Sequence, residues 1–341
     1  MLQALELGGN ASSIHAEGRA ARKMMDDARD SLGFALGCLP QMITFTGSGT
    51  EANNMALRGV QAERILVSSV EHPSVLSAAR ASGKPVELIP VDGNGVLDLA
   101  ALDKMLGGPN VLVSVMLANN ETGVVQPISA VVDLARKHGA LVHVDAVQGF
   151  GKLPVNFGLL GCDLMTVAAH KVGGPVGIGA LVIRDGLVVD PLIVGGGQEL
   201  RRRAGTENLA AITGFAAVAE ERPIDTKALQ KQLESALKDT MIIGDAVDRL
   251  PNTTCFAMPG FKAETLLMNF DLSGVAVSSG SACSSGKVGR SHVLEAMGLA
   301  PEISSAAIRV SLGWNTTAAD VQHFITVWNQ LLQRHRARKA A

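Results

Sequence analysis

The sequence predicts an α/β protein: a large domain with a mostly parallel sheet of seven strands, and a smaller α+β domain after it. Through most of the chain, short runs rich in β-branched residues alternate with amphipathic or alanine-rich segments of helical length. This alternation is typical of a parallel sheet covered by helices on both faces. After about residue 222 the alternation ends, and shorter strands and helices follow. We therefore place the large domain at 8–222 and the small domain at 223–341.

The same runs give the expected elements of each domain. In the large domain, strands are expected at 42–45, 65–68, 86–89, 111–117, 141–145, 163–167 and 179–183. Helices are expected between them at 17–32, 51–61, 75–81, 99–106 and 128–138. In the small domain, helices are expected at 226–238, 262–270, 291–297 and 317–334, and strands at 241–243, 253–256, 275–278 and 307–312. Residues 1–7 have the pattern of the end of an apolar helix.

Composition and charge restrict the class of function. The chain has 341 residues, of which 47% are hydrophobic, and this is enough for a large buried core. A net charge of −2 gives no electrostatic footprint for nucleic acid or a membrane surface, and no apolar run reaches membrane-spanning length. The cysteines show neither metal-site nor disulfide spacing, so we expect a cytoplasmic protein. They are Cys38, Cys162, Cys255 and Cys283.

Polar residues follow several strands at the edge where open parallel sheets bind ligands. In the run 46–50, glycines allow close approach of the backbone, and the start of the next helix offers N–H groups to a phosphate. A tight turn with an ordinary Ser or Thr N-cap is the alternative. Asp145 ends another strand, where a carboxylate is costly unless a cation or strong donor pairs with it. A helix-capping aspartate is the alternative there.

Lys171 follows a third strand and is flanked by small residues and glycines. Burial there would lower its pKa and make its amine a nucleophile, whereas this run taken alone favours a surface lysine. Together the three groups match what pyridoxal phosphate requires. The helix start holds the phosphate, Asp145 keeps the pyridine nitrogen protonated, and Lys171 carries the aldehyde as an imine. The sequence therefore predicts pyridoxal 5'-phosphate as the cofactor.

Cys283 lies in a run of small and polar residues at 277–287 that is too rich in glycine and serine to pack as a core strand. We expect such a segment to be mobile, because few apolar contacts would hold it. A thiol in it can be a nucleophile that moves, and its thiolate is the reactive form. An exposed cysteine without a function is the alternative.

These motifs resemble those of the class V aminotransferase superfamily of fold-type I pyridoxal phosphate enzymes, and within it those of the NifS/IscS-like cysteine desulfurases. The run FTGSGTEANN is similar to the family's phosphate loop, which implies that Gly49 and Thr50 bind the phosphate. His72, in EHPSV, matches the histidine that stacks on the cofactor ring and takes part in proton transfer. Asn120, in NNETG, matches the residue near the cofactor oxygen and the substrate.

Later motifs complete the resemblance. Asp145 and Gln148 match the partners of the pyridine nitrogen and the phenolic oxygen. His170 and Lys171 match the family's His-Lys pair, which implies that Lys171 binds the cofactor covalently. Thr206, in RAGTEN, matches the threonine that contacts the phosphate of the neighbouring subunit, so the resemblance implies a homodimer.

The resemblance also implies an activity. Arg309 matches the arginine that clamps the substrate carboxylate, and SSGSAC, which ends in Cys283, is similar to the signature of the IscS-like branch. L-cysteine would be converted into L-alanine, with Lys171 or His72 moving the α-proton and Cys283 taking the sulfur as a persulfide. The resemblance also implies a partner, a sulfur-acceptor protein such as an iron–sulfur scaffold, which would take the sulfur from Cys283. Cys283 would be a transient cluster ligand with that partner, and the resting enzyme would hold no metal.

The sequence departs from the family pattern in two places. Ala168 stands where the family commonly has a serine that contacts the phosphate, a hydrogen bond worth about 1.5–3 kcal/mol. We expect Thr166 or a water to compensate. The strand and turn that the family has before its Gly-Asn-x-Ser-Ser run are missing, which we expect to lower activity or expose apolar surface. The alternatives are therefore a selenocysteine lyase or another class V aminotransferase-like enzyme, and an N-terminally shortened, weakly active or non-catalytic paralogue that acts as a partner-binding scaffold.

Overall fold

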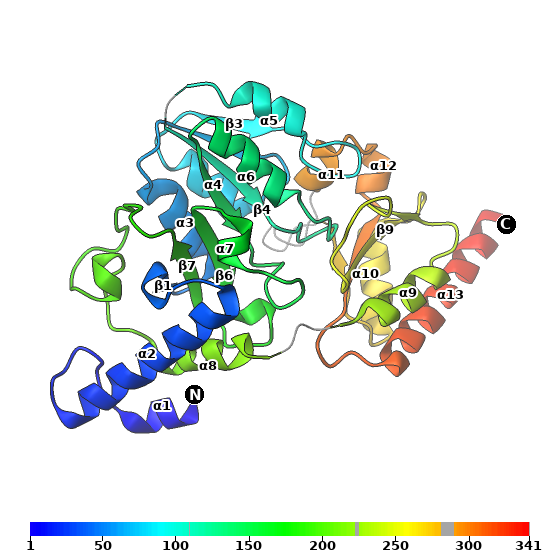
Figure 1. Cartoon of the computed structure of the whole chain (residues 1–341). Helices are drawn as coiled ribbons and strands as arrows, with labels where there is room; N and C mark the ends of the chain where they lie inside the picture. Colours follow the sequence, from blue (N-terminus) through cyan, green and yellow to red (C-terminus); the bar gives the residue numbers. More distant parts are fainter. Residues whose placement is uncertain (109, 222–224, 281–289, 341) are drawn as a thin grey trace. The chain divides into compact units, whose positions relative to one another are not determined.

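The computed structural model describes residues 1–108, 110–221, 225–280 and 290–340 (Figure 1). The chain divides into two compact units, which are described separately. The large unit consists of Met1–Pro90, Leu97–Leu117 and Gln126–Pro223. The small unit consists of Val91–Val96, Ala118–Val125 and Ile224–Ala341. Two short segments of the small unit thus come from within the sequence range expected for the large domain.

A seven-stranded sheet of order β1-β7-β6-β5-β4-β2-β3 forms the centre of the large unit. Only β7 is antiparallel to its neighbours, so the expected mostly parallel sheet is confirmed. Every strand lies within one residue of its predicted position. The strands are β1 (Ile43–Thr46), β2 (Arg64–Ser68), β3 (Val86–Ile89), β4 (Val111–Met116), β5 (Leu141–Asp145), β6 (Leu164–Ala168) and β7 (Gly179–Ile183).

Helices cover both faces of this sheet, as the sequence predicts (Figure 1). The first face is covered by α2 (Ala16–Leu36), α5 (Leu99–Met105), α6 (Ile128–Lys137) and α8 (Leu209–Ala219). The second face is covered by α3 (Gly49–Gly59) and α4 (Pro73–Arg80). The short helix α1 (Leu2–Leu7) packs on α8 and α2, and a further short helix, α7, spans Phe157–Leu160.

The sequence did not predict α8. Its sequence, LAAITGFAAVA, is apolar on nearly all sides and has no polar stripe of helical period. Most of the helix is buried against α2, and Phe215 is fully buried. A helix of this kind is indistinguishable from other apolar runs by periodicity alone.

The strand directions bring the predicted polar groups to one edge of the sheet. β1 and the parallel strands β2, β4, β5 and β6 all point the same way, because β7 is antiparallel to both β1 and β6. Asp145 is the last residue of β5, and the segments that follow β1, β2 and β6 carry Gly49, His72 and Lys171. This is the edge at which open α/β sheets bind ligands.

The small unit contains a four-stranded antiparallel sheet of order β10-β11-β9-β8. Its core is aromatic, with the ring of Trp328 5.3 Å from that of Phe256 and fully buried. The strands are β8 (Met241–Ile242), β9 (Thr253–Ala257), β10 (Ser278–Ser279) and β11 (Ala307–Ser311). The helices are α9 (Lys227–Ala236), α10 (Ala263–Leu272), α11 (His292–Ala296), α12 (Pro301–Ser304) and α13 (Ala318–Ala340). No helix in the described parts of the chain is long and apolar enough to cross a membrane.

One strand of the small unit differs from its prediction. The sequence places a strand at 275–278, whereas β10 covers only Ser278–Ser279. The N–H of Val275 donates instead to the carbonyl of Phe270, 2.9 Å away, at the end of α10. The first part of the expected strand therefore closes the preceding helix.

The segment Ala118–Val125 belongs to the small unit because it pairs with the backbone before β9. The N–H of Val125 donates to the carbonyl of Asp248 at 2.9 Å, and that of Leu250 donates to the carbonyl of Gly123 at 2.8 Å. Between these bonds, Val124 forms a β-bridge with Arg249. This pairing fixes the position of Asn120 within the small unit.

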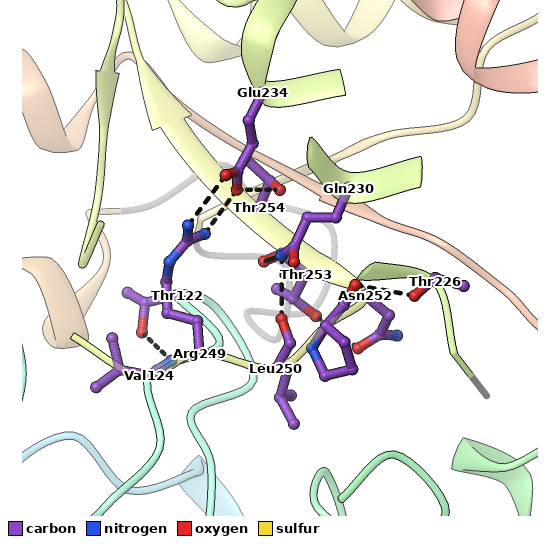
Figure 2. Close-up of polar contacts among 11 residues, drawn as sticks. Thr122, Val124, Thr226, Gln230, Glu234, Arg249, Leu250, Asn252, Thr253 and Thr254 are labelled. Atoms are coloured by element: carbon purple, nitrogen blue, oxygen red, sulfur yellow. Dashed lines mark hydrogen bonds and ion pairs between the residues drawn. The ribbon is translucent and has the colours of Figure 1, made fainter. Parts of the chain in front are cut away.

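Polar side chains hold the same region in place (Figure 2). Arg249 forms a nearly buried ion pair of 2.8 Å with Glu234, whose carboxylate also accepts the hydroxyl of Thr254 at 2.8 Å. Gln230 donates from Nε2 to the carbonyls of Leu250 and Thr253 at 3.0 and 2.8 Å. Helix α9 is thereby bonded to the backbone that pairs with the Asn120 segment.

Candidate active site

The start of α3 offers an anion-binding position directly after β1. Ser48 caps the helix and accepts the N–H of Glu51 at 3.1 Å, while the N–H groups of Gly49 and Thr50 have no acceptor within the helix. A Cβ on Gly49 would lie 3.0 Å from Cγ2 of Val147, a tight contact that glycine avoids where the helix start approaches the end of β5. The geometry suits a phosphate.

Side chains around the loop hold it in this shape. The N–H of Gly47 donates to Glu51 at 2.8 Å, and Glu51 forms an ion pair of 2.8 Å with Arg203. Arg203 opens the run that leads to Thr206, whose side chain is exposed. The structure therefore brings Arg203, and not Thr206, to the phosphate loop of the same chain. The predicted role of Thr206 in a neighbouring subunit stays a prediction.

Asp145 is buried at the end of β5, and its hydrogen-bond donors among the described residues are neutral. Its side chain is 5% exposed and accepts the N–H of Val147 at 3.0 Å and Nδ2 of Asn53 at 2.8 Å. Burial raises the pKa of Asp145, and these two bonds and the charges of His72 and Lys171 oppose that rise. A buried carboxylate in this state is suited to pair with a cation such as a protonated ring nitrogen.

Asn53 connects Asp145 to His72 through Ser74. Its Nδ2 also donates to Oγ of Ser74 at 2.9 Å, and that hydroxyl lies 2.7 Å from Nδ1 of His72. Nδ1 of His72 additionally accepts the N–H of Ser74 at 3.1 Å. Because Nδ1 is an acceptor, the neutral ring of His72 carries its proton on Nε2.

Sequence reasoning did not assign roles to Asn53 and Ser74, although both lie inside the quoted motifs. Asn53 is 1% exposed, among the apolar residues of α3 that face the sheet. A polar residue on the buried face of an amphipathic helix was the available signal, because buried amides need partners.

His170 and Lys171 follow β6 in a short 3-10 turn, and both side chains are exposed. Of the two alternatives for Lys171, the structure shows the surface lysine, so burial does not desolvate its amine in this chain. Partial burial lowers the pKa of His170, and the charges of Lys171 and Lys152 add to this effect. Gln148, three residues after Asp145, accepts Nζ of Lys152 at 2.7 Å through its Oε1.

Thr166 does not replace the hydroxyl that is missing at Ala168. Its Oγ1 lies 3.0 Å from Nε2 of His143, whose Nδ1 lies 2.9 Å from Oγ of Ser114. Burial lowers the pKa of His143 to about 3, so the ring is neutral and both of its nitrogens are used within the sheet. The atom of Thr166 near Gly49 is its methyl carbon. The expected compensation by Thr166 is therefore wrong.

We predict that Ala168→Ser strengthens cofactor binding. Cβ of Ala168 lies 3.5 Å from the position that a Cβ on Gly49 would take, so a hydroxyl there is directed to the phosphate position. A hydrogen bond to a charged group stabilises the complex by about 1.5–3 kcal/mol, so the Kd for pyridoxal phosphate should fall about tenfold or more. Fluorescence titration of the apoprotein measures it. Thr166→Ser is the control and should leave the Kd within about twofold.

In the small unit, Arg309 on β11 is bonded to the Asn120 segment. Its Nη1 donates to the carbonyl of Asn120 at 2.8 Å, and its Nη2 donates to Oγ of Ser278 at 3.1 Å. Its Nε is buried and has no hydrogen-bond partner among the described residues. The guanidinium is held in place by these two bonds, which fits the predicted role of binding a carboxylate.

Glu121, which sequence reasoning passed over, is a buried carboxyl beside this arginine. It is 3% exposed and accepts the hydroxyl of Ser291, the N-cap of α11. Burial raises the pKa of Glu121 to about 7, although the bond from Ser291 and the charge of Arg309 oppose the rise. Its position in the NNETG run, next to Asn120, was the signal in the sequence.

This pKa predicts a pH effect on stability. The native state binds the proton of Glu121 more tightly than the unfolded chain, so its contribution to stability falls as pH rises from 4.5 to about 7. Glu121→Gln keeps an acceptor for Ser291 and loses the charge. Its free energy of unfolding should exceed that of the wild type by about 3 kcal/mol at about pH 8, and match it near pH 4.5. Urea unfolding measures both.

The control is Glu295→Gln, an exposed glutamate on the same short helix α11. It should follow the wild type at both pH values. If the free energy of unfolding had the same pH dependence in the wild type and in Glu121→Gln, the raised pKa of Glu121 would be contradicted.

The described cysteines are poor nucleophiles. Burial raises the thiol pKa of Cys38 to about 11 and those of Cys162 and Cys255 to about 12. Cys162 and Cys255 are buried and Cys38 is half-buried, and none of the three is a thiolate at neutral pH. Cys283, the predicted nucleophile, lies outside the described residues. Among the described residues there is no cluster of His, Cys, Asp or Glu that could hold a metal ion.

The residues of the large unit fit pyridoxal phosphate. A glycine that admits an anion, a buried carboxylate without a cationic hydrogen-bond partner and an exposed lysine amine follow β1, β5 and β6 at one edge. These are the groups that the phosphate, the ring nitrogen and the aldehyde of that cofactor need.

Comparison with known proteins agrees with this site. The profile of the aminotransferase class-V family matches residues 3–324. The cysteine desulfurase IscS of Dictyoglomus turgidum is 38% identical, and the match spans 96% of this chain and 88% of the relative. A cysteine desulfurase of Sinorhizobium fredii is 40% identical over 94% of this chain and 88% of its own. The structure of a NifS-like protein from Rickettsia africae superposes with a TM-score of 0.90 at 35% identity, over 97% of this chain and 94% of that one.

The fold and site thus define a fold-type I enzyme, and the chain belongs to the class V aminotransferase family. Within that family it belongs with the IscS and NifS-like cysteine desulfurases.

Proposed function

We propose that the protein is a pyridoxal phosphate-dependent cysteine desulfurase that converts L-cysteine into L-alanine and transfers the sulfur to Cys283. The observation that carries the proposal is the state of Asp145. It is buried, bonded to neutral donors among the described residues, joined through Asn53 and Ser74 to His72, and within the electrostatic reach of Lys171. An ordinary structural aspartate does not need this arrangement.

The cofactor would be held by residues at the edge of the large-unit sheet. Gly49 and Thr50 bind its phosphate, Asp145 its ring nitrogen, Gln148 its phenolic oxygen and Lys171 its aldehyde carbon. His170 and His72 lie beside the ring, and Thr206 serves the phosphate of the neighbouring subunit in a homodimer. When bound, the cofactor supplies a protonated ring that withdraws electrons from the substrate.

The chain's own groups bind the substrate and move its protons. Arg309, whose guanidinium is held by the carbonyl of Asn120, binds the carboxylate of L-cysteine. His72, with Nδ1 engaged by Ser74, presents Nε2 for proton transfer. The exposed amine of Lys171 is the second proton carrier.

Cys283 accepts the sulfur. Its sulfur forms an S–S bond with the substrate sulfur, the Cβ–S bond of the substrate breaks, and the electron pair of that bond stays on the carbon, which takes a proton. The overall reaction converts L-cysteine and the Cys283 thiol into L-alanine and the Cys283 persulfide, so no external oxidant or reductant is needed. A sulfur-acceptor protein, such as an iron–sulfur scaffold with Cys283 as a transient cluster ligand, then removes the sulfur.

We also propose that the enzyme acts in the cytoplasm, which suits its free cysteines. A selenocysteine lyase is the second candidate, because the same residues bind either amino acid. The ratio of kcat/KM for L-cysteine and L-selenocysteine decides between them. A scaffold without catalysis is disfavoured by the retained Lys171, Asp145, His72, Arg309 and Cys283.

The test is to incubate the purified holoprotein with L-cysteine and a thiol reductant, and to measure alanine and sulfide. We expect both products in equal amounts from the wild type. Lys171→Ala should yield neither and should lose the absorption of the covalently bound cofactor. A wild type that neither binds pyridoxal phosphate nor forms alanine would support the scaffold instead.

A further inference from the structure

Lys152 is a buried cation that the proposed function does not use. It lies in the turn after β5, is 9% exposed, and donates from Nζ to Oε1 of Gln148 at 2.7 Å. Lysine side chains are seldom this buried unless the ammonium is bonded. Its partner, Gln148, is the residue expected to contact the phenolic oxygen of the cofactor.

The bond from Lys152 fixes which end of the Gln148 amide faces the ligand. An ammonium group can only donate hydrogen bonds. It therefore bonds to the amide oxygen of Gln148 and not to the amide NH₂ group, which is also a donor. Oε1 of Gln148 is therefore turned to Lys152, and Nε2 is left to donate elsewhere. Without Lys152, the amide could turn and present an oxygen to the phenolic oxygen, and two acceptors repel each other.

The turn that carries Lys152 packs directly against the segment of Lys171. Gly151 has φ +72, and a Cβ on it would lie 2.5 Å from Cγ1 of Val172, so this approach requires glycine. The charge of Lys152 also acts on His170. The pair of Gln148 and Lys152 is thus next to the residue that binds the cofactor aldehyde, which neighbours the phenolic oxygen in pyridoxal phosphate.

We propose that Lys152 is a positioning residue that holds the Gln148 amide with Nε2 directed at the phenolic oxygen of the cofactor. This inference rests on the proposed function. It identifies a further residue of the same site that influences the charge on the phenolic oxygen of the bound cofactor. A donor to the phenolic oxygen stabilises negative charge there and weakens the hold of the neighbouring imine nitrogen on its proton. Loss of that donor should let the imine keep its proton to higher pH.

The test is an absorption titration of the holoprotein against pH. Lys152→Met should raise the midpoint of the cofactor's spectral change by about one pH unit, and Gln148→Leu should do the same. Lys152→Arg keeps a cationic donor and should stay close to the wild type. Lys84→Met is the control, because Lys84 is a partly buried lysine whose ammonium donates to the carbonyl of Val60. Thermal unfolding of each apoprotein verifies folding, with Lys152→Leu as a second apolar variant.

The double variant separates positioning from a plain charge effect. If Lys152 acts through Gln148, adding Lys152→Met to Gln148→Leu should raise the midpoint no further. An equal rise in both backgrounds, or an unchanged midpoint in Lys152→Met, overturns the inference. A wild type with no Lys171-dependent absorption contradicts the proposed function instead, so the two failures are distinguishable.

Discussion

Replacing Cys283 by alanine is expected to reduce sulfide and alanine formation from L-cysteine by at least about a thousandfold, because the substrate sulfur then has no nucleophile to receive it. The described cysteines cannot take over this role, since burial raises their thiol pKa values to about 11 or 12. Cofactor absorption should remain as in the wild type, because Cys283 is not among the residues expected to hold the cofactor. Steady-state assays of both products measure the loss.

Cys38→Ser is the matched control for the loss of a thiol. Cys38 is half-buried, away from the sheet edge that carries Asp145 and Lys171, and lines a groove with Phe34 and Phe157. This variant should keep the wild-type rate. Sulfide release by Cys283→Ala at the wild-type rate would rule out the persulfide route.

Asp145→Asn is expected to lower kcat/KM about a hundredfold to a thousandfold while leaving the fold intact. The carboxylate supplies the negative charge that keeps the cofactor ring nitrogen protonated, and an amide cannot. The backbone N–H of Val147 keeps an oxygen acceptor in the variant. Burial of Asp145 already disfavours its charged form, so removing the charge should change the free energy of unfolding by no more than about 1 kcal/mol.

Glu71→Gln is the control for this change. Glu71 is a fully buried carboxyl near Asp145 that accepts the N–H of Met116 at 2.6 Å. Burial, and then the charge of Asp145, raise the pKa of Glu71 well above its usual range, so the site disfavours a charge on Glu71 and suits the neutral glutamine of the same shape. Its rate should stay near that of the wild type. Equal losses in the two variants would mean that Asp145 acts through packing and not through its charge.

The fold of the large unit was predictable from the sequence because its strands are short apolar runs that lie between amphipathic helices. The strand at 141–145, for example, alternates buried valines with His143 and ends at Asp145, and the structure gives the same bounds. The helix α8 was not predictable, because its apolar sequence carries no helical period. The assignment of Ala118–Val125 to the small unit depends on pairing with residues near Asp248, a contact between distant parts of the chain.

Some residues of the site could likewise be predicted from the sequence, and others could not. Residues at strand ends, such as Asp145 and the glycine at Gly49, are visible in the sequence because their position alone makes them unusual. The roles of Asn53 and Thr166 depend on where a side chain points. Asn53 turns its amide to Asp145, and Thr166 turns its hydroxyl to His143, away from the phosphate position. Sequence spacing places these residues near the site but does not orient them.

The most direct test of the account is to expose the holoprotein to a limiting amount of L-cysteine, without reductant, and to locate the sulfur by peptide mass spectrometry. The account predicts that the peptide containing Cys283 gains the mass of one sulfur atom, in step with the alanine formed, and that this gain is lost on treatment with a thiol. Alanine formed without sulfur on Cys283, or with the sulfur on Cys38, Cys162 or Cys255, would contradict it.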